Sequence, residues 1–458
     1  MAGFPDVICY NGRIRTMSAE VPEAEALAIR GKRIVGVGTD KTLLAQAGPE
    51  TRVIDLEGRR VIPGLVDAHN HAVKGAIAGL FSCKFAFTAT PDDIAAALDL
   101  FVARFPNAPF IMGGRYGSDF FERFSEQIGA SPRAWLDEKS HGRPVYLRED
   151  SGHNGWSNSA GLAMLGITKD TPDPKGGQII RDASGEATGI LLEEADVWAR
   201  GKCPDWTAAQ YREGVLEMLK IANGFGITGI TDADANENIL RAFKTVDDGD
   251  TKLTVHVAAG MTTPYGHREV PLDYELLDRW RDAYSSEHVD TRFVKIYEDG
   301  VALADSKSAA MLDPYMPDDR FPAGHCGSVH VSPEVLNQDV VELDKRGYTV
   351  KVHCCGDRAI RIVLDAVQKA REASGDSTLR HEIAHAGLIS AQDLPRFKEL
   401  NVVADLSPYL WYPSPIMLNA IKAIGNDRAS RFYPIKDLLE SGALLQAGSD
   451  CELCCGCI

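Results

Sequence analysis

The sequence of 458 residues predicts a (β/α)8 TIM barrel preceded by a small β-domain. After Arg60, apolar segments alternate with helical stretches, which is the pattern of a parallel sheet built from βα units. Many of these segments end in polar side chains that can bind metal ions, as expected where barrel strands carry catalytic groups. Eight parallel units most naturally close into a barrel. The eight segments are residues 61–71, 226–232, 253–260, 293–299, 348–356, 381–385, 402–407 and 443–450.

The rest of the chain is organised around this barrel. Residues 1–58 alternate apolar and polar positions between glycine-containing turns, which predicts short antiparallel strands in a separate β-domain. Residues 59–450 hold the barrel, and the gap at about residues 80–220 predicts an insertion that covers the barrel mouth and builds the substrate pocket. Residues 451–458 form an atypical cysteine-rich tail, whose crowded thiols are poorly spaced to wrap a tetrahedral zinc ion.

Composition narrows the function classes. The formal net charge is -16 and no basic cluster opposes it, so nucleic acid is not an expected partner. No segment reaches the ~20 consecutive apolar residues of a membrane span, and the first residues lack the pattern of a secretory signal. We therefore expect no membrane partner and a cytoplasmic location. Outside the tail the cysteines are scattered, as expected for free thiols.

A pair of histidines ends the first barrel segment. His69 and His71 stand two positions apart, and strand periodicity points both imidazoles to one side, which suits one shared metal ion. A pair of unrelated polar residues at a strand end is the alternative. The preceding Pro63-Gly64 and the position on the first strand favour the metal site.

Lys295 stands inside the apolar fourth segment, where an unpaired ammonium group would be costly. The pattern alone leaves two explanations open. Lys295 either forms an internal ion pair with Glu298 or Asp299, or has a functional role.

Later segments add further candidates. His353 and His385 end the fifth and sixth segments, and with the first two histidines they predict a cluster of four imidazoles. His381 competes with His385, but it stands at the beginning of its segment, so we favour His385. Asp450 ends the eighth segment and supplies a carboxylate that can bind a metal and carry a proton.

These motifs resemble the amidohydrolase superfamily, and within it the amidohydrolase 3 branch that includes N-substituted formamide deformylase. The resemblance covers nearly the whole chain. It is carried by the opening at residues 10–17, the block at residues 63–71, the motif at residues 150–160 in the insertion, and the later strands. One departure concerns the sixth strand, where relatives often carry Glu directly before the histidine and this chain has Ala384, with Glu382 two positions earlier.

The resemblance implies a binuclear metal site. It places His69 and His71 on the more buried metal, His353 and His385 on the outer metal, and Lys295 between them as a carbamylated bridge. Asp450 would bind the first metal and act as general base. His153 in the insertion would hold the substrate carbonyl or the developing oxyanion, although it could instead be a loop histidine packed beside Trp156. One or two divalent ions, most simply zinc, are the expected cofactor.

The expected activity is hydrolysis of an amide-type, non-peptide C–N bond by a metal-activated hydroxide, for example in an N-substituted formamide or an N-acyl amine. Deamination or decarboxylation on the same barrel is an alternative, because the fold does not fix the reaction. The expected partner is a small-molecule substrate, and a homodimer is left open.

An inactive, truncated homologue is a further alternative. Relatives continue past the eighth-strand aspartate with a helix and with strands that return to the small domain, whereas only residues 451–458 follow Asp450 here. We therefore expect the small β-domain to have unpaired edges and an uncovered apolar face, and the chain to fold poorly alone.

Overall fold

The computed structural model describes residues 3–129, 131–149, 152–262, 267–304, 306–375, 378–407 and 415–450. The chain forms two units, Met1–Leu65 and Val66–Ile458. The cysteine-rich tail at residues 451–458 lies outside the described residues, as do the first two positions of the 150–160 motif. No helix in the described ranges is long and apolar enough to cross a membrane.

The first unit holds two small sheets, with strand orders β5-β4-β1-β6 and β3-β2-β7. β1 pairs with β4 in the expected antiparallel sense, but β6 lies parallel to β1 and β7 lies parallel to β2. The parallel pairing of β6 is possible because the chain first crosses over through α1. The elements are β1 (Val7–Tyr10), β2 (Arg13–Arg15), β3 (Glu23–Ala24), β4 (Ala26–Arg30), β5 (Arg33–Gly38), α1 (Asp40–Leu44), β6 (Arg52–Asp55) and β7 (Arg60–Val61).

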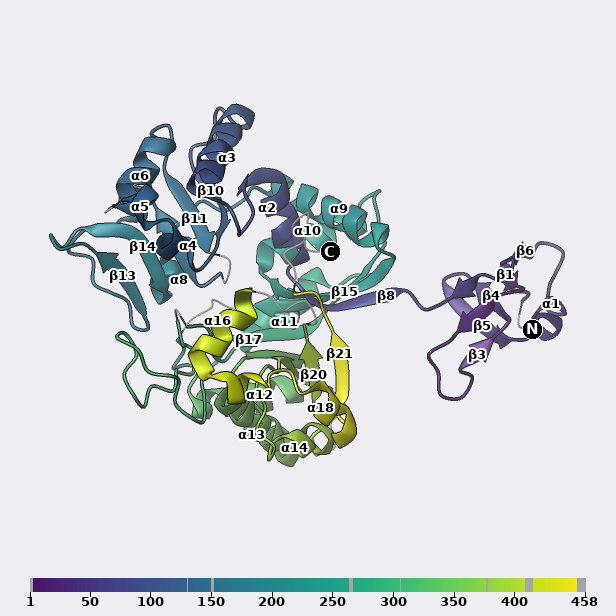
Figure 1. Ribbon diagram of the computed structural model, residues 1–458. Coiled ribbons are helices and arrows are strands. Elements are labelled where there is room, and N and C mark those ends of the chain that lie inside the picture. The colour runs from purple at the N-terminus through teal and green to yellow at the C-terminus, as the bar shows by residue number, and fades with distance from the viewer. Residues whose placement is uncertain are drawn as a thin grey trace. The chain divides into compact units, whose positions relative to one another are not determined.

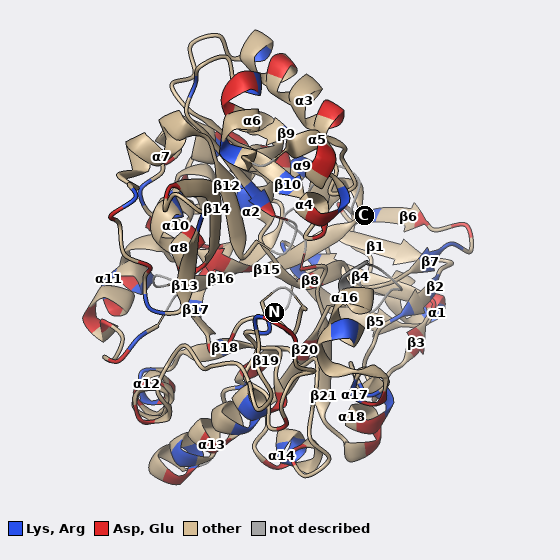
Figure 2. Cartoon of the chain, turned by 60° about the vertical axis from the view of Figure 1, so that its left-hand side comes forward, with Lys and Arg blue, Asp and Glu red and all other residues tan. Residues whose placement is uncertain are grey.

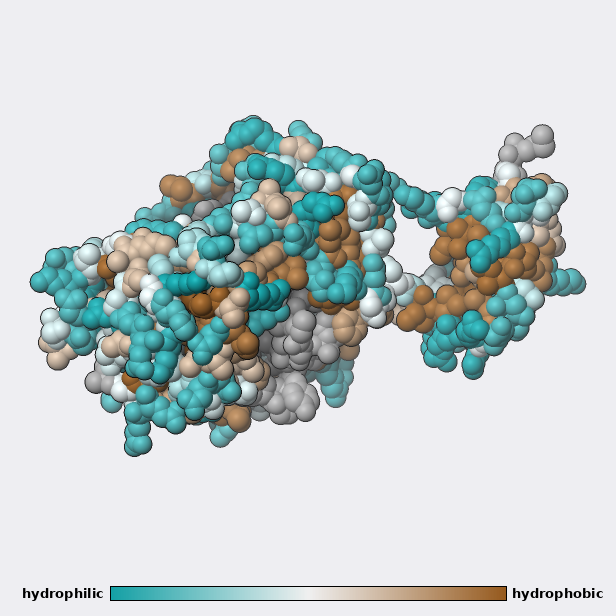
Figure 3. All heavy atoms as spheres, turned by 90° about the horizontal axis from the view of Figure 1, so that it is seen from above, coloured by the Kyte–Doolittle hydropathy of each residue, from teal (hydrophilic) through white to brown (hydrophobic). Residues whose placement is uncertain are grey.

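The core of this unit is small and one-sided. It consists of Ile8, Ala26, Ala28 and Leu43, packed between the first sheet and α1. Other apolar side chains of the same sheet face outward, including Ile34, which is 64% exposed, and several valines of β5 and β6. Figure 3 shows brown, hydrophobic spheres gathered on the surface of this unit.

The second unit is built on an eight-stranded parallel sheet that nearly closes into a barrel (Figure 1). The strand order follows the sequence, β8-β15-β16-β17-β18-β19-β20-β21, so each strand lies beside the next one of the chain. All eight predicted barrel strands are present, and the predicted fold is confirmed. The strands are β8 (Leu65–Asn70), β15 (Ile227–Ala235), β16 (His256–Thr262), β17 (Val289–Tyr297), β18 (Thr349–Cys354), β19 (Glu382–His385), β20 (Val403–Leu406) and β21 (Leu444–Ala447).

The chain after β21 closes the ring against β8. The backbone N–H of Asp450 donates to the carbonyl of His69 at 2.7 Å, and the N–H and hydroxyl of Ser449 donate to the Asp67 carboxylate at 2.9 and 2.7 Å. This approach depends on Gly448, because a Cβ atom there would lie 2.3 Å from the backbone nitrogen of His69. The first and last strand ends are thereby brought together.

Most of the helices cover the outside of the barrel and share one hydrophobic core with its strands, whereas α16 and α17 belong to a separate apolar cluster. Polar side chains cap the N-termini of several of these helices. The side chain of Asn236 caps α10, and Thr207 and Gln210 form a capping box at α9. Figure 2 shows acidic and basic residues interspersed along α12, α13 and α14. The helices are α2 (Ala72–Phe81), α9 (Ala208–Gly224), α10 (Glu237–Asp248), α11 (Tyr274–Tyr284), α12 (Pro333–Lys345), α13 (Asp357–Ser374), α14 (Leu394–Glu399), α16 (Pro415–Ile424), α17 (Asn426–Ala429) and α18 (Ile435–Ser441).

An inserted mixed sheet lies between α2 and α9 in the sequence, with strand order β13-β14-β12-β11-β10-β9. It has its own core, in which the buried Trp156 stacks on Trp135 with ring centroids 5.5 Å apart. The insertion is therefore a folded layer and not a disordered loop. Its elements are β9 (Cys83–Lys84), α3 (Pro91–Arg104), β10 (Ile111–Tyr116), α4 (Phe120–Arg123), α5 (Ser125–Ile128), α6 (Pro132–Lys139), β11 (Val145–Glu149), β12 (Asn154–Ser157), α7 (Ser159–Leu165), β13 (Gly177–Arg181), β14 (Ala187–Glu193) and α8 (Glu194–Arg200).

Candidate metal centre

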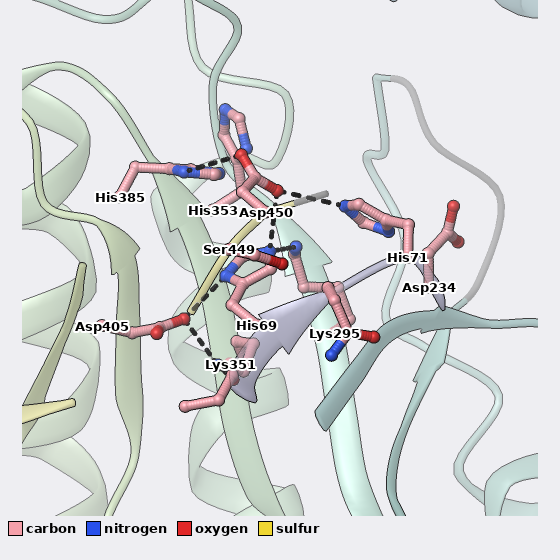
Figure 4. A network of polar contacts seen from close by, with 12 residues as sticks. His69, His71, Asp234, Lys295, Lys351, His353, His385, Asp405, Ser449 and Asp450 are labelled. Atoms are coloured by element: carbon pink, nitrogen blue, oxygen red, sulfur yellow. Dashed lines mark hydrogen bonds and ion pairs between the residues drawn. The ribbon is translucent and has the colours of Figure 1, made fainter. Parts of the chain in front are cut away.

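The six predicted metal ligands lie together at the carboxyl ends of the barrel strands (Figure 4). This follows from the topology, because all strands of a parallel barrel end on the same side. His69 lies in β8, His71 caps α2, Lys295 lies in β17, His353 in β18, His385 ends β19 and Asp450 follows β21.

Asp450 is the hub of this cluster. Its Oδ1 atom lies 3.5 Å from Nε2 of His69 and 3.4 Å from Nε2 of His71. Its Oδ2 atom lies 3.6 Å from Nδ1 of His385. Burial by itself would raise the pKa of Asp450, but His385 and His69 outweigh it and hold the pKa well below its ordinary value. Three imidazoles thus converge on one ionised carboxylate.

The surroundings of three of the imidazoles favour their neutral form. Burial lowers the pKa values of His69, His353 and His385 below the ordinary histidine value. For His69 the neighbouring Lys295 adds to the effect. A neutral imidazole keeps a nitrogen lone pair, which is the form that binds a metal ion.

The backbone at two of these strand ends is unusual. His385, Ala386 and Asp450 have φ angles of 71°, 45° and 52°, in the left-handed region that residues other than glycine rarely adopt. Such conformations cluster at functional sites, where surrounding structure holds them in place. Here they turn the His385 and Asp450 side chains into the cluster.

Lys295 is 1% exposed and has no carboxylate within ion-pair distance among the described residues. Its Nζ atom lies 3.4 Å from Nε2 of His69 and 4.6 Å from the ring centroid of Tyr297. Burial lowers the pKa of Lys295 to about 8. Neither Glu298 nor Asp299 pairs with it, so the ion-pair explanation left open by the sequence is not the one that the structure adopts.

Lys351 offers a direct comparison, because it pairs in register with Lys295 on the neighbouring strand β18. It is also fully buried, but its Nζ atom lies 2.5 Å from both the Glu382 and the Asp405 carboxylates. Burial alone would lower the pKa of Lys351, but the two carboxylates raise it above its ordinary value. The charge of Lys351 is thus balanced by two carboxylates, whereas Lys295 forms no ion pair among the described residues.

His353 joins the cluster through His385, whose ring centroid lies 4.5 Å away. Nε2 of His353 also lies 3.6 Å from Sγ of Cys355, and with Asp299 these atoms form a second group that could hold an ion. However, the Asp299 carboxylate already accepts three backbone N–H bonds, each at 2.9 Å, from two neighbouring loops. Asp299 is therefore mainly a structural residue.

His381, the competing candidate on the sixth strand, lies away from the cluster. Its Nδ1 atom accepts the backbone N–H of Val350 at 3.1 Å, and its Nε2 atom lies 3.0 Å from the Asp344 carboxylate. Both nitrogens therefore have structural partners near the start of the strand.

His153 lies in the insertion, in the loop between β11 and β12. Its Nδ1 atom is 2.9 Å from Oε2 of Glu193, a residue at the end of β14 with a φ angle of 50°. Burial would lower the pKa of His153, but Glu193 outweighs burial and raises it. His153 is thus held by a carboxylate from another strand of the insertion.

Comparison with known proteins identifies a family for this chain. The model of the amidohydrolase family matches residues 52–457, which is most of the chain. The chain belongs to the amidohydrolase family. Membership of this family implies a hydrolase that uses a divalent metal ion.

Three known proteins are similar to this amidohydrolase over nearly its whole length. Protein LONG AFTER FAR-RED 3 of Arabidopsis thaliana is 29% identical over 97% of this chain and 75% of that protein. N-substituted formamide deformylase of Arthrobacter pascens is 26% identical over 98% of this chain and 81% of that protein. The crystal structure of an uncharacterized metal-dependent hydrolase from Pyrococcus furiosus has a TM-score of 0.71 at 21% identity, covering 97% of this chain and 85% of that one, which supports the fold.

The residues of this amidohydrolase fit a divalent metal. His69, His385 and Asp450 each offer one ligand atom, and these atoms lie within 4.8 Å of one another. Nδ1 of His71 and Nδ1 of His385 are buried without a hydrogen-bond partner among the described residues. Imidazole and carboxylate donors of this kind suit zinc and similar ions.

Sequence reasoning missed two residues that touch the amidohydrolase site from below. Asp405 on β20 contacts His69 at 2.7 Å, and Lys351 contacts Asp405. A signal was available, because each is a charged residue inside an apolar strand. Lys351 also stands two positions before His353, so strand periodicity places both on the same face.

Proposed function

We propose that this amidohydrolase cleaves an amide-type, non-peptide C–N bond, such as that of an N-substituted formamide or an N-acyl amine, with one or two zinc ions. The observation that carries the proposal is the convergence of three imidazoles on the ionised Asp450 at the open end of the barrel. Such a donor set suits a hydrolytic metal and leaves a carboxylate free to move a proton.

The ligands divide into two groups in this proposal. His69 and His71 would hold the more buried ion, and His353 and His385 would hold the outer one. Lys295, whose Nζ atom lies 3.4 Å from Nε2 of His69, would serve both groups as a shared ligand in the form of a carbamate. When bound, such an ion lowers the pKa of a water molecule toward ~7 and polarises the scissile carbonyl.

Carbamylation of Lys295 follows from its surroundings. A neutral Nζ amine attacks carbon dioxide, an N–C bond forms, one proton leaves, and the side chain becomes an anionic carbamate. This reaction requires a lysine whose charge is not already balanced by carboxylates. Among the described residues Lys295 contacts an imidazole and an aromatic ring and forms no ion pair, whereas Lys351 already has two carboxylates. A buried lysine of the first kind is costly as a cation and stabilised as a metal-bound anion.

Asp450 moves the proton. It lies within 3.6 Å of three imidazoles and its side chain is 17% exposed, so it can reach both the site and an incoming water molecule. Asp450 takes a proton from the water whose oxygen bonds to the acyl carbon. It then returns that proton to the leaving nitrogen as the C–N bond breaks, giving a carboxylic acid and an amine. No protein nucleophile is needed.

His153 contributes from the insertion. The Glu193 carboxylate contacts Nδ1 of His153 and raises its pKa, which favours the protonated form, in which both ring nitrogens are hydrogen-bond donors. We assign to His153 the role of donating a hydrogen bond to the substrate carbonyl oxygen, where negative charge develops.

Product analysis tests the proposed reaction. Purified protein incubated with a panel of N-substituted formamides and N-acyl amines should release an amine and an acid in equal amounts, and chelation should stop the release. Ammonia from an aminated ring would instead indicate a deaminase, and carbon dioxide would indicate a decarboxylase. Either result would overturn the proposed C–N hydrolysis.

The same assay tests His153. His153→Gln should lower kcat/KM by ~10² or more with metal content unchanged, which is the scale seen for loss of one oxyanion donor. His141→Gln is the control, because His141 also pairs with a carboxylate of the insertion, Asp99, but its side chain is half-exposed. Equal kinetics in the two variants would remove His153 from the reaction.

A further inference from the structure

A buried polar network lies directly beneath the candidate metal centre. Nζ of Lys351 lies 2.5 Å from Oδ2 of Asp405 and 2.5 Å from Oε2 of Glu382, and it donates to the carbonyl of Ala68 at 3.0 Å. Gln446 donates to Glu382 at 2.7 Å. These residues come from β18, β20, β19, β8 and β21, so one lysine ties together both sides of the barrel closure.

The network reaches the metal centre at one point. Oδ2 of Asp405 lies 2.7 Å from Nδ1 of His69, and both side chains are 0% exposed. Figure 4 shows Asp405 and Lys351 below His69, on the side away from Asp450. An ionised carboxylate only accepts hydrogen bonds, so Nδ1 must carry the proton and Nε2 must carry the lone pair. Nε2 is the nitrogen that faces Lys295 at 3.4 Å and Asp450 at 3.5 Å.

We propose that Asp405 and Lys351 are positioning residues, which fix His69 in the tautomer and orientation that present Nε2 to the metal. The inference rests on the proposed function only in taking His69 as a metal ligand. A carboxylate behind a metal-binding histidine sets its tautomer and raises its basicity. The ammonium group of Lys351 donates to the same carboxylate oxygen and holds it in place beside His69.

Asp405 and Glu382 differ in the residues that they contact. Both carboxylates contact Lys351, but of these two carboxylates only Asp405 has a contact with His69 in the described part of the chain. Oδ2 of Asp405 receives both the lysine and the imidazole, while Oδ1 is buried without a hydrogen-bond partner in the described part of the chain. A buried oxygen without a hydrogen bond is costly, which argues that Asp405 is held for its contact with His69 and not for packing alone.

Metal affinity is the first test. Metal-free protein is titrated with Zn²⁺ in competition with a chelating indicator. Asp405→Leu should weaken zinc binding by ~10-fold to ~100-fold, the usual effect of losing such a partner. Asp405→Asn should fall between this variant and the unsubstituted protein, because an amide oxygen still accepts from His69 but carries no charge. Glu382→Gln is the matched control and should change the affinity by less than about threefold.

The tautomer of His69 is the second test, because a loss of protein stability alone would not produce the expected result. In metal-free protein with ¹⁵N-labelled histidine, the His69 signal is identified by its loss in His69→Gln. We expect a protonated Nδ1 and an unprotonated Nε2 in the unsubstituted protein and in Asp405→Asn, and a mixture in Asp405→Leu. This measurement stands even if Asp405→Leu does not fold, because the unsubstituted protein is informative alone.

Two outcomes would overturn the inference. One is a protonated Nε2 on His69 in the unsubstituted, metal-free protein. The other is a folded Asp405→Leu variant that binds zinc as tightly as the Glu382→Gln control. If the unsubstituted protein bound no divalent ion at all, the proposed function itself would fail, so the two failures are distinguishable.

Discussion

Replacing Asp450 by Asn is expected to lower kcat by ~10² or more while the protein keeps at least one metal ion. Asparagine has nearly the same shape and can still offer its amide oxygen to a metal, but it cannot take a proton from water or return one to the leaving nitrogen. The effect should therefore appear in kcat and not in folding. Steady-state kinetics and elemental analysis of the same sample measure the two quantities together.

Asp365→Asn on the outer helix α13 serves as the control, because Asp365 is half-exposed and pairs only with Arg396 among the described residues. It should leave kcat unchanged. An Asp450→Asn enzyme with kcat close to that of the control would show that another group moves the proton.

Replacing Lys295 by Ala is expected to remove most of the bound metal and most of the activity. The side chain has no ion pair among the described residues, so its loss should not destabilise the metal-free protein. Added bicarbonate or a short carboxylate such as formate should restore part of the metal binding by occupying the place of the carbamate. Carbon-13 NMR after labelling with ¹³CO2 should show a carbamate signal that the variant lacks.

Lys351→Ala should behave in the opposite way. It leaves two buried carboxylates unpaired, and breaking a buried ion pair typically costs ~3–5 kcal/mol of unfolding free energy. No small carboxylate should rescue it. Unchanged metal content in Lys295→Ala, or equal rescue of both variants, would contradict a bridging role for Lys295.

The sequence predicts most of this site because strand ends are visible in it. A run of apolar residues that ends in His or Asp marks the carboxyl end of a strand, and barrel topology then brings those ends together. His69, His385 and Asp450 could be assigned in this way. His381 could be set aside because it stands at the wrong end of its segment, and the structure gives it structural partners.

The support beneath the site could not be read from the sequence in the same way. His69 and Asp405 are 336 residues apart and meet only because the barrel closes. Strand periodicity says which face a side chain occupies, but not which layer of the barrel it shares with other strands. For the same reason the two buried lysines look alike in sequence, although Lys351 finds two carboxylates and Lys295 finds none within the described residues.

Elemental analysis of active protein purified without chelators will show whether the cluster at the carboxyl ends of the barrel strands holds a catalytic metal. We expect between one and two equivalents of divalent metal per chain, mainly zinc, and a loss of turnover when the metal is removed that is reversed when zinc is returned. Full activity in protein that contains no divalent metal would contradict the account.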